Sequence, residues 1–309
     1  MVFISDAAYM DLIRESDEIS GKTKTLYVYA LRTVAKDLDA PSIHQMLHDP
    51  AIYVARMRSR YPNDNTLKTL TSALVTTLRY AAADGSLLAA WRGLLQSASR
   101  AVSDRIDSNE PTPRQTAAHV EWPDVLRARD ALPDGPDRLF LMMHTCMAPR
   151  RQWDYAAVTV YTSNDHVPDP NGGNYIHLDP PGGAPPYVRL TEFKTAKKRG
   201  AGEDEVWTKD LPRDLLDAIR RSFRESPRTY LFETRAGRKY ESASSFRKWS
   251  NGVLKRALGN ESASLNTLRH SYLTWYLRRH PDITLAERKA IARDMGHGVM
   301  TSLAYVLLV

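Results

Sequence analysis

The C-terminal stretch 266–305 reads NTLRHSYLTWYLRRHPDITLAERKAIARDMGHGVMTSLAY and has the most distinctive spacing in the chain. An Arg-His pair that begins at Arg269 opens a segment in which apolar residues recur at helical spacing. A Gly-His pair that ends at His297 closes a second such segment, and Tyr305 follows His297 by eight residues. The pattern predicts C-terminal helices at 268–279, 285–294 and 301–308.

The first third of the chain predicts a small helical bundle. Apolar residues recur every three or four positions in three segments, which Pro- or Gly-containing turns separate. The segments are 25–38, 66–82 and 86–102. The expected N-cap residues are Thr25, Asn65 and Ser86. We expect four or five helices within residues 1–107.

The stretch 108–118, SNEPTPRQTAA, predicts a linker, because it is polar, contains two prolines and has little apolar surface to bury. A second domain is expected at 119–309. Its helices before the C-terminal stretch are expected at 122–131, 138–147, 213–224 and 242–257. Its strands are expected at 156–161, 175–178, 187–190 and 205–211. The sequence therefore predicts a mainly α fold with a small antiparallel β-sheet, which is an α+β domain after a helical N-terminal domain.

Composition sets broad limits on function. The 309 residues include 43 Lys and Arg against 36 Asp and Glu, which gives a net charge of +7 and a pI near 9.4. This balance favours a polyanionic partner without identifying one. Cys146 is the single cysteine, so no intramolecular disulfide can form, and no Cys/His cluster has zinc-ligand spacing. Without a secretory signal or a long uncharged apolar run, we expect an intracellular protein.

The order of the C-terminal residues resembles the catalytic end of the tyrosine recombinase (phage-integrase-like) family. The family motif runs His-x-x-Arg-His, then Gly-His, then a nucleophilic tyrosine. The pairs at 269–270 and 296–297 and the later Tyr305 match this order. In the family, the tyrosine usually follows this histidine by nine residues. In this chain, Tyr305 follows His297 by eight. The resemblance covers roughly 120–309, and for 1–107 it rests on helical content and position.

The stretch 147–161, MAPRRQWDYAAVTVY, resembles the first-arginine box of the family, in which Gly-x-Arg is followed three residues later by Glu. Counting from Arg151 places Asp154 at the acidic position, a better match than counting from Arg150. Pro149 stands where the family usually has Gly. The resemblance implies that Arg151 clamps the scissile phosphate and that Asp154 pins it by hydrogen bonding. A solvated Arg-Arg pair at a helix C-terminus also fits the helix dipole.

Arg269 matches the second clamp of the family, because it begins a helix with an apolar face and precedes His270. Asn266 stands three residues earlier, where the family usually carries His or Lys. An amide can donate to a phosphate but cannot act as a base, so the proton of Tyr305 would pass to water or another residue. His270 points about 100° round the helix from Arg269 and is expected to be structural. By resemblance, His297 would bind a phosphate oxygen and help to position the tyrosine.

The segment 189–200, RLTEFKTAKKRG, lies between two expected strands and resembles the hairpin that carries the family's lysine. The resemblance implies that Lys194 protonates the leaving 5′-oxygen, although Lys197 is an alternative and a charged hairpin tip needs no function. The expected DNA-binding residues are Arg150, Lys197, Lys198 and Arg199, with Lys22 and Lys24 just before one N-terminal helix and Lys68 on another. For any single one of these charges, a solvated surface is the favoured explanation.

The resemblance implies a site-specific recombinase or integrase. Tyr305 would attack the scissile phosphate and form a 3′-phosphotyrosyl link, and the freed 5′-hydroxyl would attack the link in a partner strand, without metal or cofactor. The partners would be double-stranded DNA and further copies of the chain, as a tetramer on two DNA sites. We expect no membrane association, and a place in the cytoplasm or nucleoid of a prokaryote or the nucleus of a host. The unusual arginine box suggests a phage, virus or transposable element.

Two other functions stay open. A type IB topoisomerase shares the same Arg, Lys, Arg, His and Tyr chemistry but relaxes supercoils as a monomer, and the helical first domain, 1–107, favours the recombinase over it. A DNA-binding protein descended from a recombinase that no longer cuts would explain Asn266 and the short spacing between His297 and Tyr305. An assay for DNA strand cleavage would distinguish this non-cutting protein from both enzymes. By the same resemblance, the first domain is a core-binding domain that clamps DNA.

Overall fold

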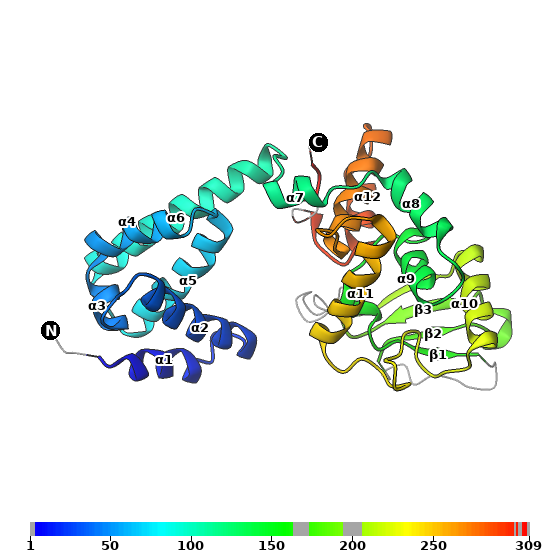
Figure 1. The fold of residues 1–309 in the computed structure, drawn as a ribbon, viewed down its shortest axis with the longest axis horizontal. Coiled ribbons are helices and arrows are strands. Elements are labelled where there is room, and N and C mark those ends of the chain that lie inside the picture. Colours follow the sequence, from blue (N-terminus) through cyan, green and yellow to red (C-terminus); the bar gives the residue numbers. More distant parts are fainter. Residues whose placement is uncertain (1–3, 163–172, 194–205, 300, 302–304, 308–309) are drawn as a thin grey trace. The chain divides into compact units, whose positions relative to one another are not determined.

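The structure, a computed structural model, describes residues 4–162, 173–193, 206–299, 301 and 305–307. The chain divides into two compact units, Met1–Ser108 and Asn109–Val309. Each unit has a hydrophobic core of its own, as an independent domain does. Figure 1 labels most helices and strands of both units.

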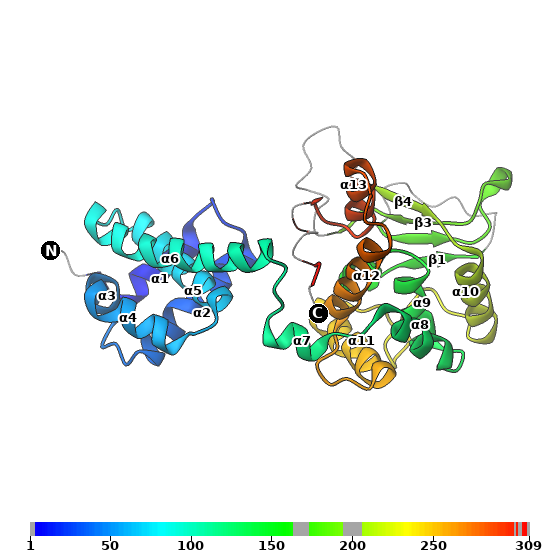
Figure 2. The same ribbon diagram turned by 90° about the horizontal axis from the view of Figure 1, so that it is seen from above.

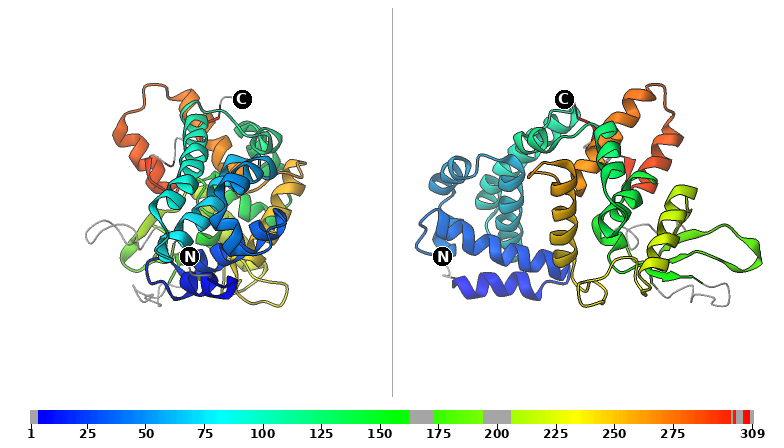
Figure 3. Two further views of the ribbon diagram at one scale, coloured as in Figure 1. Left: turned by 90° about the vertical axis from the view of Figure 1, so that its left-hand side faces the viewer. Right: turned by 45° about the vertical axis from the view of Figure 1, so that its right-hand side comes forward.

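Unit 1 is a bundle with six described helices, where the sequence predicts four or five. They are α1 (Asp6–Glu15), α2 (Gly21–Asp37), α3 (Ile43–His48), α4 (Pro50–Arg60), α5 (Asp64–Tyr80) and α6 (Gly85–Asp107). Helices α5 and α6 pack against each other, and α2 packs against α5 (Figure 3). Trp91 of α6 is fully buried, and its indole Nε1 donates to the Leu47 carbonyl at 2.8 Å. The largest side chain of this core is therefore held by packing and by one hydrogen bond.

The N-caps of α2, α5 and α6 lie two to five residues before the predicted ones. They are Ser20, Asn63 and Asp84. Each side-chain oxygen accepts a backbone N–H from the first turn of its helix, a contact that stabilises by about 1 kcal/mol. Lys22 and Lys24 therefore lie in the first turns of α2 and not before it.

Unit 2 is mainly helical with one small sheet, which confirms the predicted fold class. Its helices are α7 (Pro113–Ala118), α8 (Trp122–Ala131), α9 (Pro136–Thr145), α10 (Arg213–Glu225), α11 (Ala243–Leu258), α12 (Leu265–Arg279) and α13 (Leu285–Asp294), with 3-10 turns at η1 (Gln152–Tyr155) and η2 (Pro181–Gly183). Its strands are β1 (Thr159–Tyr161), β2 (Tyr175–His177), β3 (Tyr187–Leu190) and β4 (Trp207–Asp210). Apart from the terminal helix, the predicted elements of this unit lie within three residues of these bounds.

The sheet is mixed, whereas the sequence predicts antiparallel pairing throughout. Its strand order is β1-β2-β3-β4, and β1 pairs with β2 in parallel, with Thr159 opposite Tyr175. The other two pairs, β2-β3 and β3-β4, are antiparallel. Parallel neighbours need a connection of about a dozen residues to return the chain, which the long stretch between β1 and β2 supplies. Strand periodicity alone does not reveal the direction of this pair.

The predicted linker, 108–118, contains a helix and lies mostly in unit 2. Pro113 begins α7, where proline's missing N–H is harmless. Thr112 and Gln115 form a capping box, in which the Thr112 N–H donates to Gln115 Oε1 at 2.8 Å and the Gln115 N–H donates to Thr112 Oγ1 at 3.2 Å. Pro113 of this stretch therefore marks the start of a helix.

Helix α9 packs against the sheet in the core of unit 2 (Figures 1 and 2). Its residues 139–143 share one apolar cluster with Ile176 of β2 and Val188 of β3. Helix α13 lies beside β4 (Figure 2). Asp294 at its end accepts from Lys209 Nζ at 2.9 Å, so the sheet holds the end of this helix.

The predicted terminal helix at 301–308 is wrong at 305–307. Tyr305 lies in a turn, and the two residues after it have no regular secondary structure. The Leu307 N–H donates to Thr274 Oγ1 of α12 at 3.1 Å. The Leu307 N–H therefore binds a side chain of α12 and not a carbonyl of its own segment. The amphipathic pattern of 305–307 does not form a helix.

Candidate active site

The candidate residues converge on the carboxyl end of α13. After Asp294 the chain turns through Gly296, whose φ of +73° lies in the left-handed region. The Gly296 N–H donates to the Arg293 carbonyl at 2.9 Å, and the His297 N–H donates to the Ala292 carbonyl at 2.9 Å. This is a Schellman motif, in which a left-handed glycine ends a helix. The Gly-His pair is thus a helix terminus that fixes the place of His297.

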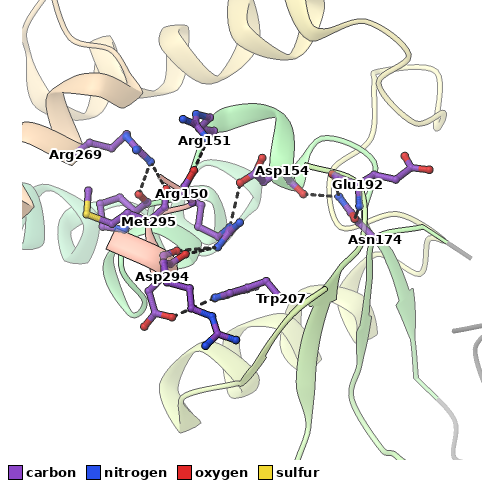
Figure 4. A network of polar contacts seen from close by, with 12 residues as sticks. Arg150, Arg151, Asp154, Asn174, Glu192, Trp207, Arg269, Asp294 and Met295 are labelled. Carbon is purple, nitrogen blue, oxygen red and sulfur yellow. Dashed lines mark hydrogen bonds and ion pairs between the residues drawn. The ribbon is translucent and has the colours of Figure 1, made fainter. Parts of the chain in front are cut away.

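Three arginines bind the carbonyl groups that this terminus leaves free (Figure 4). The successive carbonyls of 294–296 accept from Arg150 Nη1 at 2.9 Å, from Arg269 Nη1 at 2.8 Å and from Arg151 Nη1, in that order. A helix C-terminus carries partial negative charge and unpaired carbonyls, so it attracts cations. The end of α13 thereby joins the two arginine motifs, which are far apart in the sequence.

Arg150 has no exposed surface. Its Nε donates to Asp154 Oδ2 at 3.0 Å in a buried ion pair, and its Cζ lies 4.2 Å from the ring centroid of Trp207. Asp154 therefore pins Arg150, and not Arg151 as predicted. Because Arg150 is sealed between these groups, its predicted contact with DNA is not possible in this arrangement. Arg151, one residue later, is partly exposed.

Tyr305 lies against Arg269 and His297. Arg269 is 1% exposed, and its Cζ lies 4.6 Å from the centroid of the Tyr305 ring. The His297 imidazole stacks on the same ring, with centroids 5.2 Å apart and planes 14° apart. The structure thus brings together the second arginine, the histidine of the Gly-His pair and the tyrosine. The first-arginine box reaches the same cluster through the end of α13.

Several buried nitrogens of this cluster make no hydrogen bond within the described part of the chain. They are Arg150 Nη2, Arg269 Nε, Arg269 Nη2 and His297 Nε2. A Cβ on Gly296 would meet Arg150 Nη2 at 3.1 Å, so glycine is needed here for space as well as for its φ. A buried N–H without an acceptor costs about 1–3 kcal/mol. Guanidinium N–H groups of this kind suit an oxyanion such as phosphate.

His297 is held as a neutral ring. Burial lowers its pKa to about 3, and the positive charge of Arg269 contributes in the same direction. Its Nδ1 lies 3.3 Å from the Gly298 carbonyl, which can only accept, so this nitrogen carries the proton. The lone pair is then on Nε2, which can accept a hydrogen bond, and the low pKa makes this nitrogen a weak base.

Burial disfavours the charged forms of Arg269 and Asp154, and neighbouring groups oppose this effect. Burial lowers the pKa of Arg269, an effect that the Tyr305 hydroxyl opposes, and an arginine so placed stays charged. Burial raises the pKa of the Asp154 carboxyl, while Arg150 and Arg151 lower it. The ion pair with Arg150 and the helix terminus are therefore what keep this group of charges together.

Asn266 lies at the surface in the first turn of α12. Its exposed side chain makes no hydrogen bond to any described residue. It lines a pocket of about 240 Å³ with Arg114, His119 and His270, among others, but not with Arg269. The expected hairpin residues lie outside the described part of the chain. They are Lys194, Lys197, Lys198 and Arg199.

Two residues that the sequence does not single out connect the cluster to the sheet (Figure 4). The Asn174 amide donates to the Asp154 carbonyl at 3.0 Å and to the Glu192 carbonyl at 2.9 Å. It thereby fixes the chain just before the predicted hairpin lysine. Trp207 covers Arg150, and its Nε1 donates to an Asp294 oxygen at 3.2 Å. Asn174 follows a glycine-rich stretch that reads as a loop, so no sequence signal marks it.

The predicted DNA-binding lysines of unit 1 lie on two helices. Lys22 is exposed at the start of α2, and Lys68 is partly exposed on α5. Lys24 Nζ donates to the Arg14 carbonyl at 2.8 Å. These positions leave the charge of all three within reach of solvent, and their contact with DNA stays a prediction.

Comparison with known proteins gives similarity of structure but not of sequence. No protein-family model and no curated protein matches the sequence. A crystal structure of XerA recombinase aligns with 99% of this chain and 95% of its own, with a TM-score of 0.41 and 12% identity. At that TM-score the alignment carries no argument. In the described segments, no helix is long and apolar enough to cross a membrane, and no three His, Cys, Asp or Glu side chains group as metal ligands.

Proposed function

We propose that this chain cleaves and rejoins DNA strands as a tyrosine recombinase does, with Tyr305 as the nucleophile. The observation that most supports this function is the presence of buried guanidinium N–H groups without an acceptor on Arg269, which lies against the Tyr305 ring. Such forks bind phosphate oxygens in pairs and stay charged. A phenol beside a bound phosphate is suitably placed to attack it.

In the proposed reaction, the Tyr305 oxygen bonds to phosphorus and the bond from phosphorus to the 5′-oxygen breaks. The phenol proton passes to water, and Lys194 gives a proton to the leaving oxygen. The product is a 3′-phosphotyrosyl link and a free 5′-hydroxyl. When the 5′-hydroxyl of a partner strand attacks the link, the tyrosine is released and the number of phosphoester bonds is unchanged.

The arginines have different parts in this proposal. The Tyr305 ring covers Arg269 in this structure, so a phosphate reaches Nε and Nη2 of Arg269 once the ring moves aside. Arg151 is partly exposed and can be the first of the clamps to meet DNA. Arg150 and Asp154 position the end of α13, because they bind one another and its carbonyls. Asn266, which faces another pocket, takes no part.

The same proposal assigns the two units and their partners. Unit 1 would be the core-binding domain, with Lys22, Lys24 and Lys68 near the DNA backbone, and unit 2 would be the catalytic domain. Exchange between two DNA sites would need a tetramer of the chain. Double-stranded DNA is the expected substrate, and no metal or cofactor is part of the chemistry.

The test is incubation with supercoiled plasmid and with nicked duplexes in the presence of a chelator, followed by a denaturing gel. We expect a covalent protein–DNA adduct from the wild type and none from Tyr305→Phe. Tyr276→Phe, on α12, is the matched control and should form the adduct. Plasmid relaxation by the monomer would instead indicate a topoisomerase. DNA binding without any adduct would contradict the proposal and favour a protein that binds but does not cut.

A further inference from the structure

The segment that carries Tyr305 is bound by α12 of the same chain. His270 Nδ1 donates to the Tyr305 carbonyl at 2.9 Å, and the two ring centroids lie 4.8 Å apart. One turn further along α12, Thr274 Oγ1 accepts the Leu307 N–H at 3.1 Å. Thr274 and Leu307 are both buried, at 2% and 3% exposure. Two side chains of one helix therefore hold the backbone of this segment.

A chain of hydrogen bonds from α7 fixes the orientation of His270. The N–H and the hydroxyl of Thr112 both donate to Gln115 Oε1 at 2.8 Å. The amide nitrogen of Gln115 must then face the other way, where it lies 3.3 Å from His270 Nε2. Because a carbonyl can only accept, His270 Nδ1 carries the proton for Tyr305, and Nε2 accepts from the amide.

The surroundings of His270 agree with this assignment. Burial lowers its pKa, with a further contribution from Arg269, so the ring is neutral at pH 7 and has one proton to place. The Gln115 amide places that proton on the nitrogen that faces Tyr305. A neutral histidine between an amide donor and a carbonyl acceptor is a fixed contact and not a mobile one.

We propose that His270, oriented by Gln115, is a positioning residue that holds the Tyr305 backbone on its own chain while the ring leaves Arg269 to attack phosphate. This inference rests on the proposed function. The ring must move by rotation about its side-chain bonds, and a fixed backbone limits where the hydroxyl can go. Misplacement of a reacting group by about 1 Å can lower a rate about 100-fold. His270 thus has a more specific part than the structural one that the sequence predicts.

The test compares three substitutions at this position. His270→Phe keeps a ring but removes the donor, and should lower the single-turnover rate of adduct formation about 10- to 100-fold while the Kd for DNA changes less than about 2-fold. His270→Asn places an amide nitrogen where Nδ1 was and should restore most of the rate. His270→Gln reaches too far and should not. Gln115→Ala should lower the rate less than His270→Phe does, because the donor stays but the tautomer is no longer fixed.

Hydrogen exchange of the C-terminal peptide that contains Leu307 gives a reading that does not depend on activity. We expect faster exchange in His270→Phe and in Thr274→Val, a variant of similar shape that lacks the acceptor hydroxyl, and protection restored in His270→Asn. Thr274→Val also serves if His270→Phe does not fold.

The outcomes separate the two proposals. A wild-type rate and unchanged exchange in His270→Phe and Thr274→Val would overturn the positioning role. Equal rates for His270→Asn and His270→Gln would also overturn it, because the role depends on where the donor lies. Failure of the wild type to form any adduct, with exchange still faster in the variants, would overturn the proposed function and the catalytic purpose of this contact, but not the contact itself.

Discussion

Unit 2 buries two arginines, whereas the described part of unit 1 buries none. In unit 1 the arginines are exposed: Arg14 and Arg60 have side chains 48% and 58% exposed, and their ion pairs lie at the surface. In unit 2, Arg150 and Arg269 are 0% and 1% exposed and bind the end of one helix. A surface ion pair contributes roughly 0–1 kcal/mol, whereas a buried one that loses a partner costs about 3–5 kcal/mol. Only the buried cations therefore indicate a site.

Replacement of a buried arginine should have the greatest effect on activity. In Arg269→Ala, adduct formation should fall roughly 10²- to 10³-fold, because a preorganised donor pair for the phosphate is lost. Arg269→Lys should be nearly as inactive, since an ammonium cannot replace the fork. The matched control is Arg279→Ala, at the exposed end of the same helix. A variant at position 269 that retained most of the activity would remove the arginine from the site.

Loss of the buried carboxylate should have a large effect on stability. Asp154→Asn leaves Arg150 without its counter-charge and should lower the free energy of unfolding by about 3 kcal/mol, measured in urea. Glu261→Gln, which removes an exposed partner of Lys255, should change it by less than about 1 kcal/mol. Equal changes in the two variants would mean that the contrast between buried and exposed charges does not govern stability here.

A buried histidine behind the arginines should make the fold sensitive to acid. His144 is fully buried and its pKa is lowered to about 3, first by burial and then by Arg269 and Arg150. The unfolded chain binds the proton near pH 6.5, so stability is complete above that pH and falls as the pH drops toward 3. His144→Leu should reduce the dependence of the free energy of unfolding on pH by about 1.4 kcal/mol per pH unit. Urea unfolding at pH 7, 6 and 5 measures the free energy of unfolding of both proteins. An equal dependence on pH in wild type and variant would contradict this role of His144.

Exposed lysines of unit 1 should have the smallest effect. Lys22→Ala and Lys68→Ala should each weaken DNA binding a few-fold and lower the slope of log K against log salt by about 1, without a change in stability. Lys255→Ala in unit 2 should leave the slope unchanged. Unaltered slopes for both unit 1 variants would assign these lysines to a solvated surface.

The sequence predicts most of the fold because its signals are local. Apolar spacing locates α8 and α13 at their observed bounds. Pairing direction is not local, which is why the parallel pair of β1 and β2 is missed. The prediction of a helix at 305–307 is wrong for a related reason. Thr274 and His270 of another helix bind the backbone of this segment, and these contacts are not local.

The candidate site is predictable in its residues but not in its contacts. Arg269, His297 and Tyr305 meet as their order indicates. The partner of Asp154 is different from the predicted one, because the choice between Arg150 and Arg151 depends on which guanidinium faces the core. The three carbonyls of 294–296 that gather the arginines are backbone groups, which a sequence pattern of side chains does not show.

The most direct measurement is identification of the residue that carries the DNA. A nicked duplex that loses its 5′-hydroxyl fragment would trap the covalent complex, and nuclease and protease digestion followed by mass spectrometry would locate the nucleotide on the chain. We expect a phosphotyrosyl bond at Tyr305, with no modified peptide from Tyr305→Phe. A nucleotide on any other residue, or no covalent product from a duplex that the protein binds, would contradict the proposed chemistry at the end of α13.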